Sequence, residues 1–161
     1  MKTVEGFIAA CREKGLNVTY QRILIYKALH KMKTHPTAEE IYKDVLNEYP
    51  SISLATVYKT LETLAEHGLL SKVTKLHDLA RYDADTDPHH HLLCVRCRKV
   101  VDVHEDHFNN LPLPQNNGFQ VQGYRIQFEG LCRKCAIETG SLAETNGKNA
   151  EAITFCGKAG A

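Results

Sequence analysis

The sequence has no apolar run near the roughly 20 residues that a helix needs to cross a bilayer. Its first six residues, MKTVEG, lack the basic-then-apolar order of a signal peptide. These two absences argue against a membrane protein and against a secreted one. We therefore expect a cytoplasmic location and no membrane partner.

An excess of positive charge is also missing, because 20 lysines and arginines face 19 aspartates and glutamates, giving a net charge of +1. Any DNA-binding surface must therefore come from the local arrangement of residues rather than from bulk charge. Cysteine and histidine are by contrast plentiful, with six and nine residues among 161. In a reducing compartment, clustered cysteines indicate metal binding rather than disulfides.

Residues 1–68 have the apolar periodicity of helices. A first helix is expected over residues 3–14, ending before Gly15, which suits the left-handed position after a helix. A second helix is expected to begin at Thr19. The third begins with Thr37-Ala-Glu-Glu40, a capping box in which side chains satisfy the first N–H groups of the helix.

The fourth helix is predicted over residues 54–67, after Ser53 as N-cap and before Gly68. One face carries its apolar residues, and small, hydroxylated or cationic residues lie elsewhere: Ala55, Thr56, Lys59, Thr60 and Thr63. Such side chains fit against a phosphate backbone and base edges, although an ordinary solvated helix face would have a similar composition.

Two short strands, residues 70–75 and 79–83, are predicted next around a polar turn. The order helix, helix, strand, strand is that of a winged helix-turn-helix, with residues 54–67 as recognition helix and the hairpin as wing.

The periodicity changes after Pro88. Segments 91–95, 99–103 and 119–129 alternate like strands, and residues 104–117 have room for only a short helix. The fold class is therefore predicted as α+β, an N-terminal winged helix-turn-helix domain followed by a small α/β dimerisation domain. The predicted divisions are a DNA-binding domain at 1–84, a hinge at 85–88, a metal-binding dimerisation domain at 89–139 and a mobile tail at 140–161.

Two CxxC pairs, Cys94 with Cys97 and Cys132 with Cys135, are separated by 34 residues. Each CxxC turn directs two sulfurs at one centre, so two turns complete a tetrahedron of four thiolates. This closed arrangement suits one structural zinc ion per chain. The alternative is two independent redox-active or buried pairs. Outside the pattern, Cys11 is expected in the core and Cys156 in the tail.

Histidines and carboxylates crowd the first CxxC pair. Alternation along a strand places His89 and His91 on one face and His90 on the other. With Asp83 and Asp102 they would form a nitrogen and oxygen site suited to iron(II), manganese(II) or zinc. The alternative is a histidine-rich loop exposed to solvent.

The chain resembles the ferric uptake regulator family along residues 10–136. The segments that carry the resemblance are Thr19-Tyr-Gln-Arg22, His35-Pro-Thr-Ala38, Ser53-Leu-Ala-Thr-Val-Tyr58, Arg81-Tyr-Asp83, His89-His-His-Leu-Leu-Cys94 and both CxxC pairs. The resemblance implies a homodimer that binds a double-stranded inverted-repeat operator, with one regulatory iron(II) or manganese(II) per chain held by His35, Asp83, His89, His91 and Asp102. It also extends the expected DNA-contacting set to Thr19, Gln21, Arg22, Ser53, Ala55, Thr56, Tyr58, Lys59 and Thr60.

Within the family, aspartate at both carboxylate positions is similar to the peroxide-sensing branch, whereas iron-sensing members usually carry glutamate there. The positions that match a further metal site of many iron sensors are Pro88, His90, Asn109 and Tyr124, so that site is expected to be absent. The resemblance then implies repression by the metal-bound form and derepression when peroxide oxidises His35 or His89. Lys59 departs from well-known peroxide sensors, which carry asparagine there, and leaves the operator preference open.

Three alternatives stay open from the sequence. An iron-status or zinc-status repressor of the same family would differ only in how the ligands are tuned. A zinc metalloenzyme is disfavoured, because a four-thiolate site has no position for water and the HxE and PCxxC pair of zinc deaminases is missing. We therefore expect no enzyme and no organic substrate. A zinc-storage or scaffold protein is the third alternative.

Overall fold

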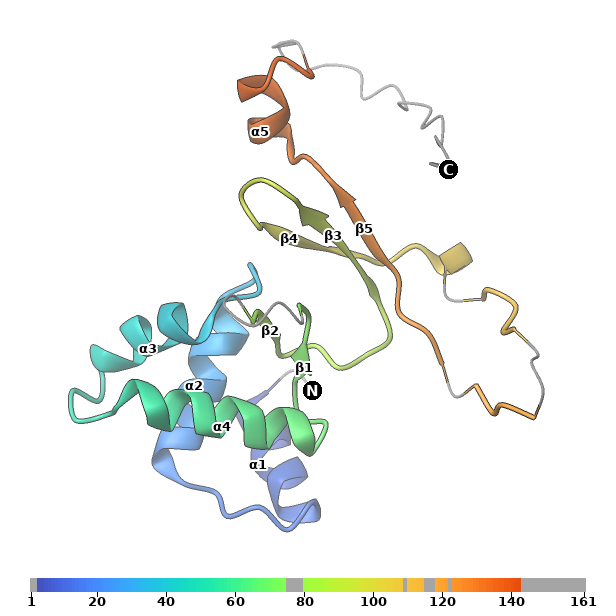
Figure 1. The fold of residues 1–161 in the computed structure, drawn as a ribbon. Coiled ribbons are helices and arrows are strands. Elements are labelled where there is room, and N and C mark those ends of the chain that lie inside the picture. The colour runs from blue at the N-terminus through green and yellow to red at the C-terminus, as the bar shows by residue number, and fades with distance from the viewer. Residues whose placement is uncertain (1–2, 75–79, 109, 115–117, 122, 143–161) are drawn as a thin grey trace.

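The computed structural model describes residues 3–74, 80–108, 110–114, 118–121 and 123–142. Four helices make up the first half of the chain, and a small sheet with one further helix makes up the second (Figure 1). The four helices are α1 (Val4–Glu13), α2 (Tyr20–Lys31), α3 (Ala38–Leu46) and α4 (Leu54–Glu66). Of the tail predicted as mobile, residues 143–161 lie outside the described residues, and Cys156 lies there too.

Each of the four helices begins after a threonine or serine whose side-chain oxygen accepts a backbone N–H of the first turn. The predicted starts at Thr19, Thr37 and Ser53 are confirmed. In α3 the capping box is complete, with Thr37 N donating to Glu40 Oε2 at 2.8 Å and Glu40 N donating to Thr37 Oγ1 at 3.3 Å. Gly15, after α1, has a φ of 70°, a conformation that costs a residue with a Cβ.

The four helices and the wing enclose one hydrophobic core. Phe7 of α1 stacks on Tyr26 of α2, with ring centroids 4.0 Å apart and an interplanar angle of 6°. Val57, Leu61 and Leu64 of α4 are fully buried in the same core, as predicted from their spacing. Cys11 is fully buried as well, which confirms its expected place.

The wing consists of β1 (Ser71–Lys72) and β2 (Tyr82–Asp83), paired antiparallel. Both strands are shorter than the predicted 70–75 and 79–83, and residues 75–79 lie outside the described part of the chain. A further hydrogen bond, from Val73 N to Arg81 O at 2.8 Å, continues the pairing beyond the strands. The order of elements is that of a winged helix-turn-helix domain.

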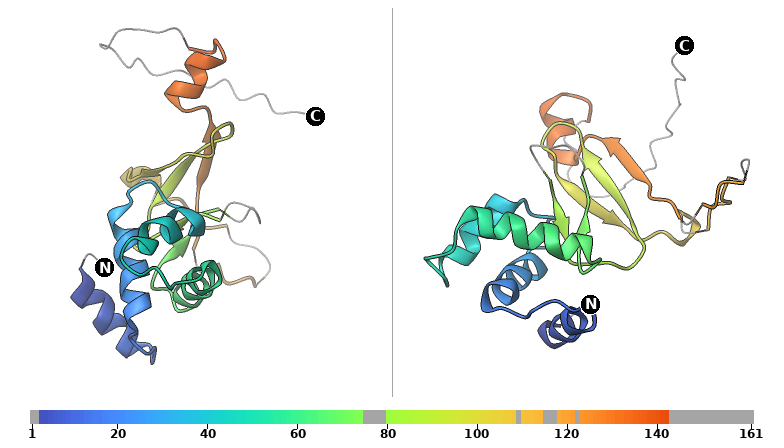
Figure 2. Two further views of the ribbon diagram at one scale, coloured as in Figure 1. Left: turned by 90° about the vertical axis from the view of Figure 1, so that its left-hand side faces the viewer. Right: turned by 60° about the horizontal axis from the view of Figure 1, so that its bottom comes forward.

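The second half contains a three-stranded sheet of β3 (His90–Cys94), β4 (Val100–Val103) and β5 (Gln127–Gly130). Its order is β4-β3-β5, with β3 antiparallel to β4 and parallel to β5. A single 3₁₀ turn, η1 (Asp106–Phe108), follows β4, and α5 (Arg133–Glu138) follows β5. Figures 1 and 2 show the sheet between the helical half and α5, which lies at the far end of the molecule.

Two predictions for this half were wrong. Residues 119–129 were expected as one strand, but of the described residues there only 127–129 belong to β5. The ladder between β5 and β3 begins at the pair His91 and Gln127, with one further hydrogen bond from His91 N to Ile126 O at 3.3 Å. The chain before β3 turns away toward the wing, so none of the described strands pairs with residues 119–121 and 123–125. Helix α5 was not predicted, because the CxxC spacing in it was interpreted only as a metal-binding turn.

The sheet half has little hydrophobic core among its described residues. Its buried apolar residues are Leu93, Cys94, Val100, Val103, Cys135 and Ala136. Its exposed ones are larger and include Leu92, Val95, Val101, Leu111, Leu113, Phe119 and Leu131. A half with this balance depends on something besides burial within one chain for its stability. No helix in the described residues is both long and apolar enough to span a membrane.

Candidate metal centres and DNA-binding surface

The four cysteines of the two CxxC pairs meet at one point. The sulfurs of Cys94, Cys97, Cys132 and Cys135 all lie within 4.8 Å of one another, and those of Cys97 and Cys132 are 3.6 Å apart. Zinc at about 2.3 Å from each of four sulfurs requires sulfur separations of about 3.8 Å. The pairs converge on one centre, which disfavours the reading of two independent pairs.

The backbone around the cysteines explains how they are brought together. Cys94 ends β3, and Arg98 takes a left-handed φ of 60° so that the chain can turn from the first CxxC pair back into β4. Cys132 lies between β5 and α5, and its N–H donates to Cys94 Sγ at 3.3 Å. This N–H and that of Cys97 lower the pKa of Cys94 to about 6, whereas burial raises the pKa of Cys135 to about 12. The donor set, soft and closed, fits zinc.

A second cluster joins the two halves of the chain. His35 comes from the loop between α2 and α3, Asp83 from β2, His89 and His91 from the start of the sheet, and Asp102 from β4. One nitrogen or oxygen from each lies within 4.8 Å of all the others. His35 Nε2 is 2.7 Å from Asp102 Oδ1, and His89 Nε2 is 2.9 Å from Asp83 Oδ2.

The converging atoms of this cluster are buried and lack hydrogen-bond partners in suitable geometry. They are the Nε2 atoms of all three histidines, Asp83 Oδ2 and Asp102 Oδ1. Short separations without aligned hydrogen bonds are what a set of ligands around a common cation shows, and buried polar atoms without partners are otherwise costly. The cluster therefore fits a metal ion better than it fits a network of hydrogen bonds. Nitrogen and carboxylate donors suit iron(II), manganese(II) or zinc.

The cluster is also prepared for a cation electrostatically. His89 Nδ1 is 2.7 Å from Asp87 O; a proton on this nitrogen would leave Nε2 as a free donor atom facing the cluster. Burial opposes ionisation of Asp83, but the imidazoles of His35 and His91 outweigh it and hold the pKa of Asp83 well below its usual range. Burial likewise lowers the pKa of His35, but Asp83 and Asp102 outweigh it and raise that pKa. A cation that binds to His35 Nε2 must displace any proton held there.

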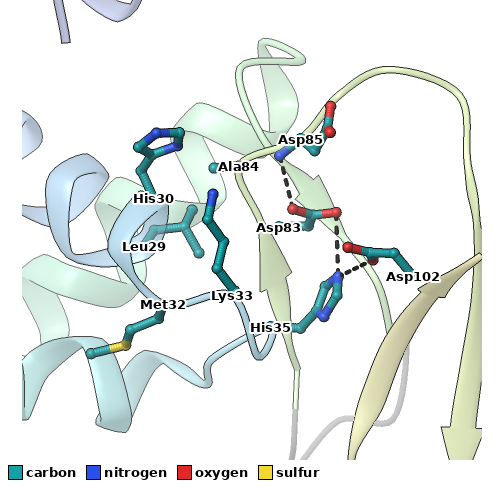
Figure 3. A pocket seen from close by; sticks show the side chains of 9 residues that line it. All are labelled: Leu29, His30, Met32, Lys33, His35, Asp83, Ala84, Asp85 and Asp102. Carbon is teal, nitrogen blue, oxygen red and sulfur yellow. Dashed lines mark hydrogen bonds and ion pairs between the residues drawn. The ribbon is translucent and has the colours of Figure 1, made fainter. Parts of the chain in front are cut away.

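The loop that carries His35 is held in an unusual conformation. His35 has a φ of 51°, in the left-handed region that residues with a Cβ seldom adopt, and it precedes the fully buried Pro36. Figure 3 shows His35, Asp83 and Asp102 turned toward one another at one side of a cavity of about 250 Å³. Residues of α2 and the chain after it, including His30 and Lys33, line the other side.

His90 points away from the cluster, as the alternation of β3 predicts. Its Nε2 lies 3.0 Å from Phe108 O, and Ile126 N donates to its Nδ1 at 3.4 Å. Tyr124 stacks near its ring and also donates to Phe108 O, at 2.6 Å. Both ring nitrogens of His90 are thus engaged by the backbone, and no further group of metal ligands occurs among the described residues. The expected absence of a second regulatory site stays a prediction, because Asn109 lies outside the described residues.

The expected DNA-contacting residues of α2 and α4 lie side by side. A groove of about 370 Å³ is lined by Asn17, Thr19, Gln21, Arg22, Thr56, Lys59, Thr60 and Thr63. Ser53 and Ala55 are exposed at the start of α4, and the Tyr58 hydroxyl donates to Glu39 of α3. Thr60 differs from expectation because only 8% of it is exposed, so it has little surface to offer DNA. Asn17, which the sequence did not single out, lines the same groove.

Comparison with known proteins places these features in a family. The model of the ferric uptake regulator family matches residues 13–129. The chain belongs to this family. The peroxide-responsive repressor PerR of Staphylococcus aureus strain Mu50 is 34% identical over 134 residues, which cover 82% of this chain and 90% of that protein. The chain is therefore a metal-responsive transcriptional regulator and not an enzyme.

Solved structures of family members have the same fold. The Helicobacter pylori ferric uptake regulator Fur matches with a TM-score of 0.66 at 18% identity, over 89% of this chain and 97% of that one. The Vibrio cholerae regulator Fur, reported with a rearrangement of its DNA-binding domains, matches with a TM-score of 0.60 at 25% identity, over 77% of this chain and 98% of that one. These matches confirm the predicted fold class.

The four-cysteine site leads to a prediction about folding. Replacing Cys94 with serine should release the zinc and unfold the sheet half or separate the dimer, because metal binding and folding are linked where the core is small. Metal analysis and sedimentation of the purified protein measure both effects. Cys11→Ala, which removes a buried thiol from α1, is the control and should keep its zinc. A folded, dimeric Cys94→Ser protein without zinc would contradict the assignment.

Proposed function

We propose that this chain is a peroxide-sensing repressor that binds an inverted-repeat operator as a homodimer when its regulatory metal is bound. The observation that carries the proposal is the five-ligand cluster between the two halves. His35 and Asp83 belong to the helical half, and His89, His91 and Asp102 belong to the sheet half. A cation shared by both halves stabilises the one relative orientation in which all five ligands reach it.

The proposed division of the chain follows from this arrangement. Residues 1–84 form the DNA-binding domain, 85–88 the hinge and 89–139 the dimerisation domain. The Vibrio cholerae relative is reported with rearranged DNA-binding domains, which supports a movable joint between the two halves of this fold. Fixing the hinge in a dimer sets the distance between two recognition helices, which must match half-sites about 34 Å apart, one turn of DNA.

The proposed DNA-binding surface is the groove between α2 and α4. The cations Arg22 and Lys59 lie there with the hydroxyl groups of Thr19 and Thr56, so the groove offers both phosphate contacts and hydrogen bonds to bases. Helix α4 is the recognition helix, because its buried stripe leaves Ala55 and Lys59 outward. This local arrangement supplies what the net charge of +1 does not.

The proposed dimer is supported by the exposed apolar residues of the sheet half. Leu92 of β3 and Val101 of β4 are opposite each other in the ladder, and 48% and 44% of their surfaces are exposed. Phe119 is 78% exposed, and it lies in the alternating stretch 119–129 at a point where none of the described strands pairs with it. A second copy of the chain would bury these residues.

Two metals per chain follow from the donor sets. The four cysteines would hold a structural zinc, and His35, Asp83, His89, His91 and Asp102 would hold iron(II) or manganese(II). When bound, iron(II) supplies the redox chemistry with peroxide that manganese(II) does not. The peroxide branch is favoured over iron sensing by the paired aspartates and by the PerR relative at 34% identity. His35 and His89 are the proposed sites of oxidation, as the family resemblance implies, and the Nε2 atom of each points into the cluster.

Removing His35 tests the requirement for metal. His35→Ala should abolish manganese-dependent operator binding while the zinc and the fold remain, because one of only two ligands from the DNA-binding half is lost. Fluorescence anisotropy of labelled operator, with and without manganese(II), measures this. His30→Ala, at the other side of the same cavity, is the control and should respond to manganese like the wild type. Metal-dependent binding by His35→Ala would argue against a regulatory role for the cluster.

Replacing Lys59 tests the DNA surface. Lys59→Ala should weaken operator binding and reduce the slope of log affinity against log salt by about one, because one phosphate contact and its released counterion are lost. Binding measured over a series of salt concentrations gives the slope. Lys134→Ala removes the same charge from α5, at the other end of the molecule, and should leave the slope unchanged. An unchanged slope for Lys59→Ala would show that this face of α4 does not contact the DNA phosphates.

Peroxide treatment separates peroxide sensing from iron sensing. The iron-loaded protein should leave its operator in micromolar hydrogen peroxide and gain the mass of one oxygen on peptides containing His35 or His89. The manganese-loaded protein should keep both its DNA and its mass. Operator binding and mass spectrometry of the same samples measure the two effects. Iron-loaded protein that stays on DNA without added oxygen would favour an iron-status repressor instead.

A further inference from the structure

Three consecutive residues of the wing contact three different parts of the molecule. Asp83 is one of the five clustered ligands, Tyr82 extends into the helical core, and Arg81 reaches back to the loop of His35. Because a strand directs successive side chains to opposite faces, one short segment can contact the cluster and the helices at the same time. The contacts of Arg81 and Tyr82 show what holds the two ligands of the helical half in place.

Arg81 holds the loop that carries His35. Its Nη1 donates to His35 O at 2.7 Å, and the same nitrogen lies 3.5 Å from Glu40 Oε2. Only 14% of the Arg81 side chain is exposed, and its backbone pairs with that of Thr37. A charged donor on the carbonyl of a residue with a φ of 51° helps to keep that residue in its uncommon conformation. Through Glu40, which completes the capping box, Arg81 also reaches α3.

Tyr82 holds the recognition helix. Its ring is fully buried, and its hydroxyl donates to Glu62 Oε1 of α4 at 2.9 Å. Its backbone N–H donates to Pro36 O at 3.0 Å, so the same residue also contacts the loop that follows His35. Lys72 of β1 donates to the same oxygen of Glu62 at 2.8 Å. The strand that carries Asp83 is therefore connected to α4 by a neutral donor from the core and a charged donor from the wing.

We propose that Arg81 and Tyr82 are positioning residues that join the regulatory metal cluster to the DNA-binding helices. Arg81 sets the position of His35 and so the affinity of the cluster for metal. Tyr82, through Glu62, makes α4 move as one body with Asp83, so that fixing the ligands also fixes the recognition helix. The inference rests on the proposed function and identifies the route by which the metal acts on DNA binding.

The proposal predicts different effects for the loss of each side chain. Loss of the Tyr82 hydroxyl should leave metal binding by the free protein intact and weaken the coupling between metal and DNA. Loss of the Arg81 guanidinium should weaken metal binding itself. Coupling between two ligands is reciprocal, so DNA must increase the affinity for metal by the factor by which metal increases the affinity for DNA. A general loss of stability would also weaken metal binding by the free protein, so a loss of coupling alone identifies the route through Tyr82.

Tyr82→Phe is the direct test, because it keeps the buried ring and removes only the hydroxyl. We expect the ratio of operator affinities with and without manganese(II) to fall by roughly three- to tenfold, within the usual range of coupling between sites. The ratio of manganese affinities with and without operator should fall by the same factor. Anisotropy and calorimetric titration measure the two ratios on the zinc-loaded dimer, and manganese affinity of the free variant should stay within about twofold of the wild type.

Glu62→Ala removes the same hydrogen bond from the surface side and does not disturb the core, since 45% of the Glu62 side chain is exposed. It should reproduce the loss of coupling even if Tyr82→Phe folds poorly. Lys72→Met is the matched control, because it removes the ion pair to Glu62 and leaves the hydroxyl bond. Lys72→Met should keep both affinity ratios near the wild-type values, even if its affinity for the operator changes equally with and without manganese.

Arg81→Met completes the set. It should weaken manganese binding by the free protein roughly tenfold, the equivalent of losing one charge-assisted hydrogen bond, while the zinc content stays constant. If the wild type responds to manganese but both Tyr82→Phe and Glu62→Ala keep the wild-type affinity ratios, the route through Tyr82 is overturned. The role of Arg81 is not affected by that result. Unchanged metal affinity in Arg81→Met would overturn the role of Arg81. A wild type without any response to manganese would overturn the proposed function together with this inference.

Discussion

The meeting of five donor atoms between the two halves is the constraint on which the arrangement of the molecule depends. Three imidazole nitrogens and two carboxylate oxygens lie within 4.8 Å of one another without hydrogen bonds of their own. Buried imidazole nitrogens and carboxylate oxygens without aligned hydrogen bonds are costly, and a cation held by all five atoms would remove that cost. In the proposed function, a bound metal would therefore favour the arrangement in which the two halves meet.

Groups around the cluster hold two of its histidines in position. His35 is kept in a left-handed conformation by Arg81 and by the buried proline that follows it. His89 is fixed through its second ring nitrogen by the carbonyl of Asp87, which lies in the proposed hinge. His35 and His89 are thus positioned by neighbouring groups, and in the proposed function a movement of the hinge would shift those groups. The proposed function thus makes metal binding, hinge angle and the placement of α4 parts of one equilibrium.

The features that depend on residues close together in the sequence could be predicted from it. The starts of α2, α3 and α4 follow from Thr19, Thr37 and Ser53, because a cap acts within one helical turn. Both clusters were predicted residue by residue, the cysteines from their spacing and His35 only from a family resemblance. The partners of a strand are not local, and so the strand predicted over residues 119–129 was too long: of the described residues there, only 127–129 belong to β5. The contacts of Arg81 with His35 and of Tyr82 with Glu62 join distant positions, and no spacing in the sequence indicates them.

The parallel pairing of β3 with β5 has a consequence for the chain before it folds. A loop of more than 30 residues must close to bring Cys94 and Cys97 beside Cys132 and Cys135. The few buried apolar residues among those described in the sheet half offset little of the entropy lost in this closure. A cross-link over such a loop removes conformational freedom from the disordered chain worth on the order of 4 kcal/mol, by the relation derived for disulfides. Zinc held by the four sulfurs would act in the same way. Its stabilising effect would come largely from the conformational entropy that the unfolded chain loses. In a zinc-depleted chain, the sheet half should therefore unfold at a lower temperature than the helical half.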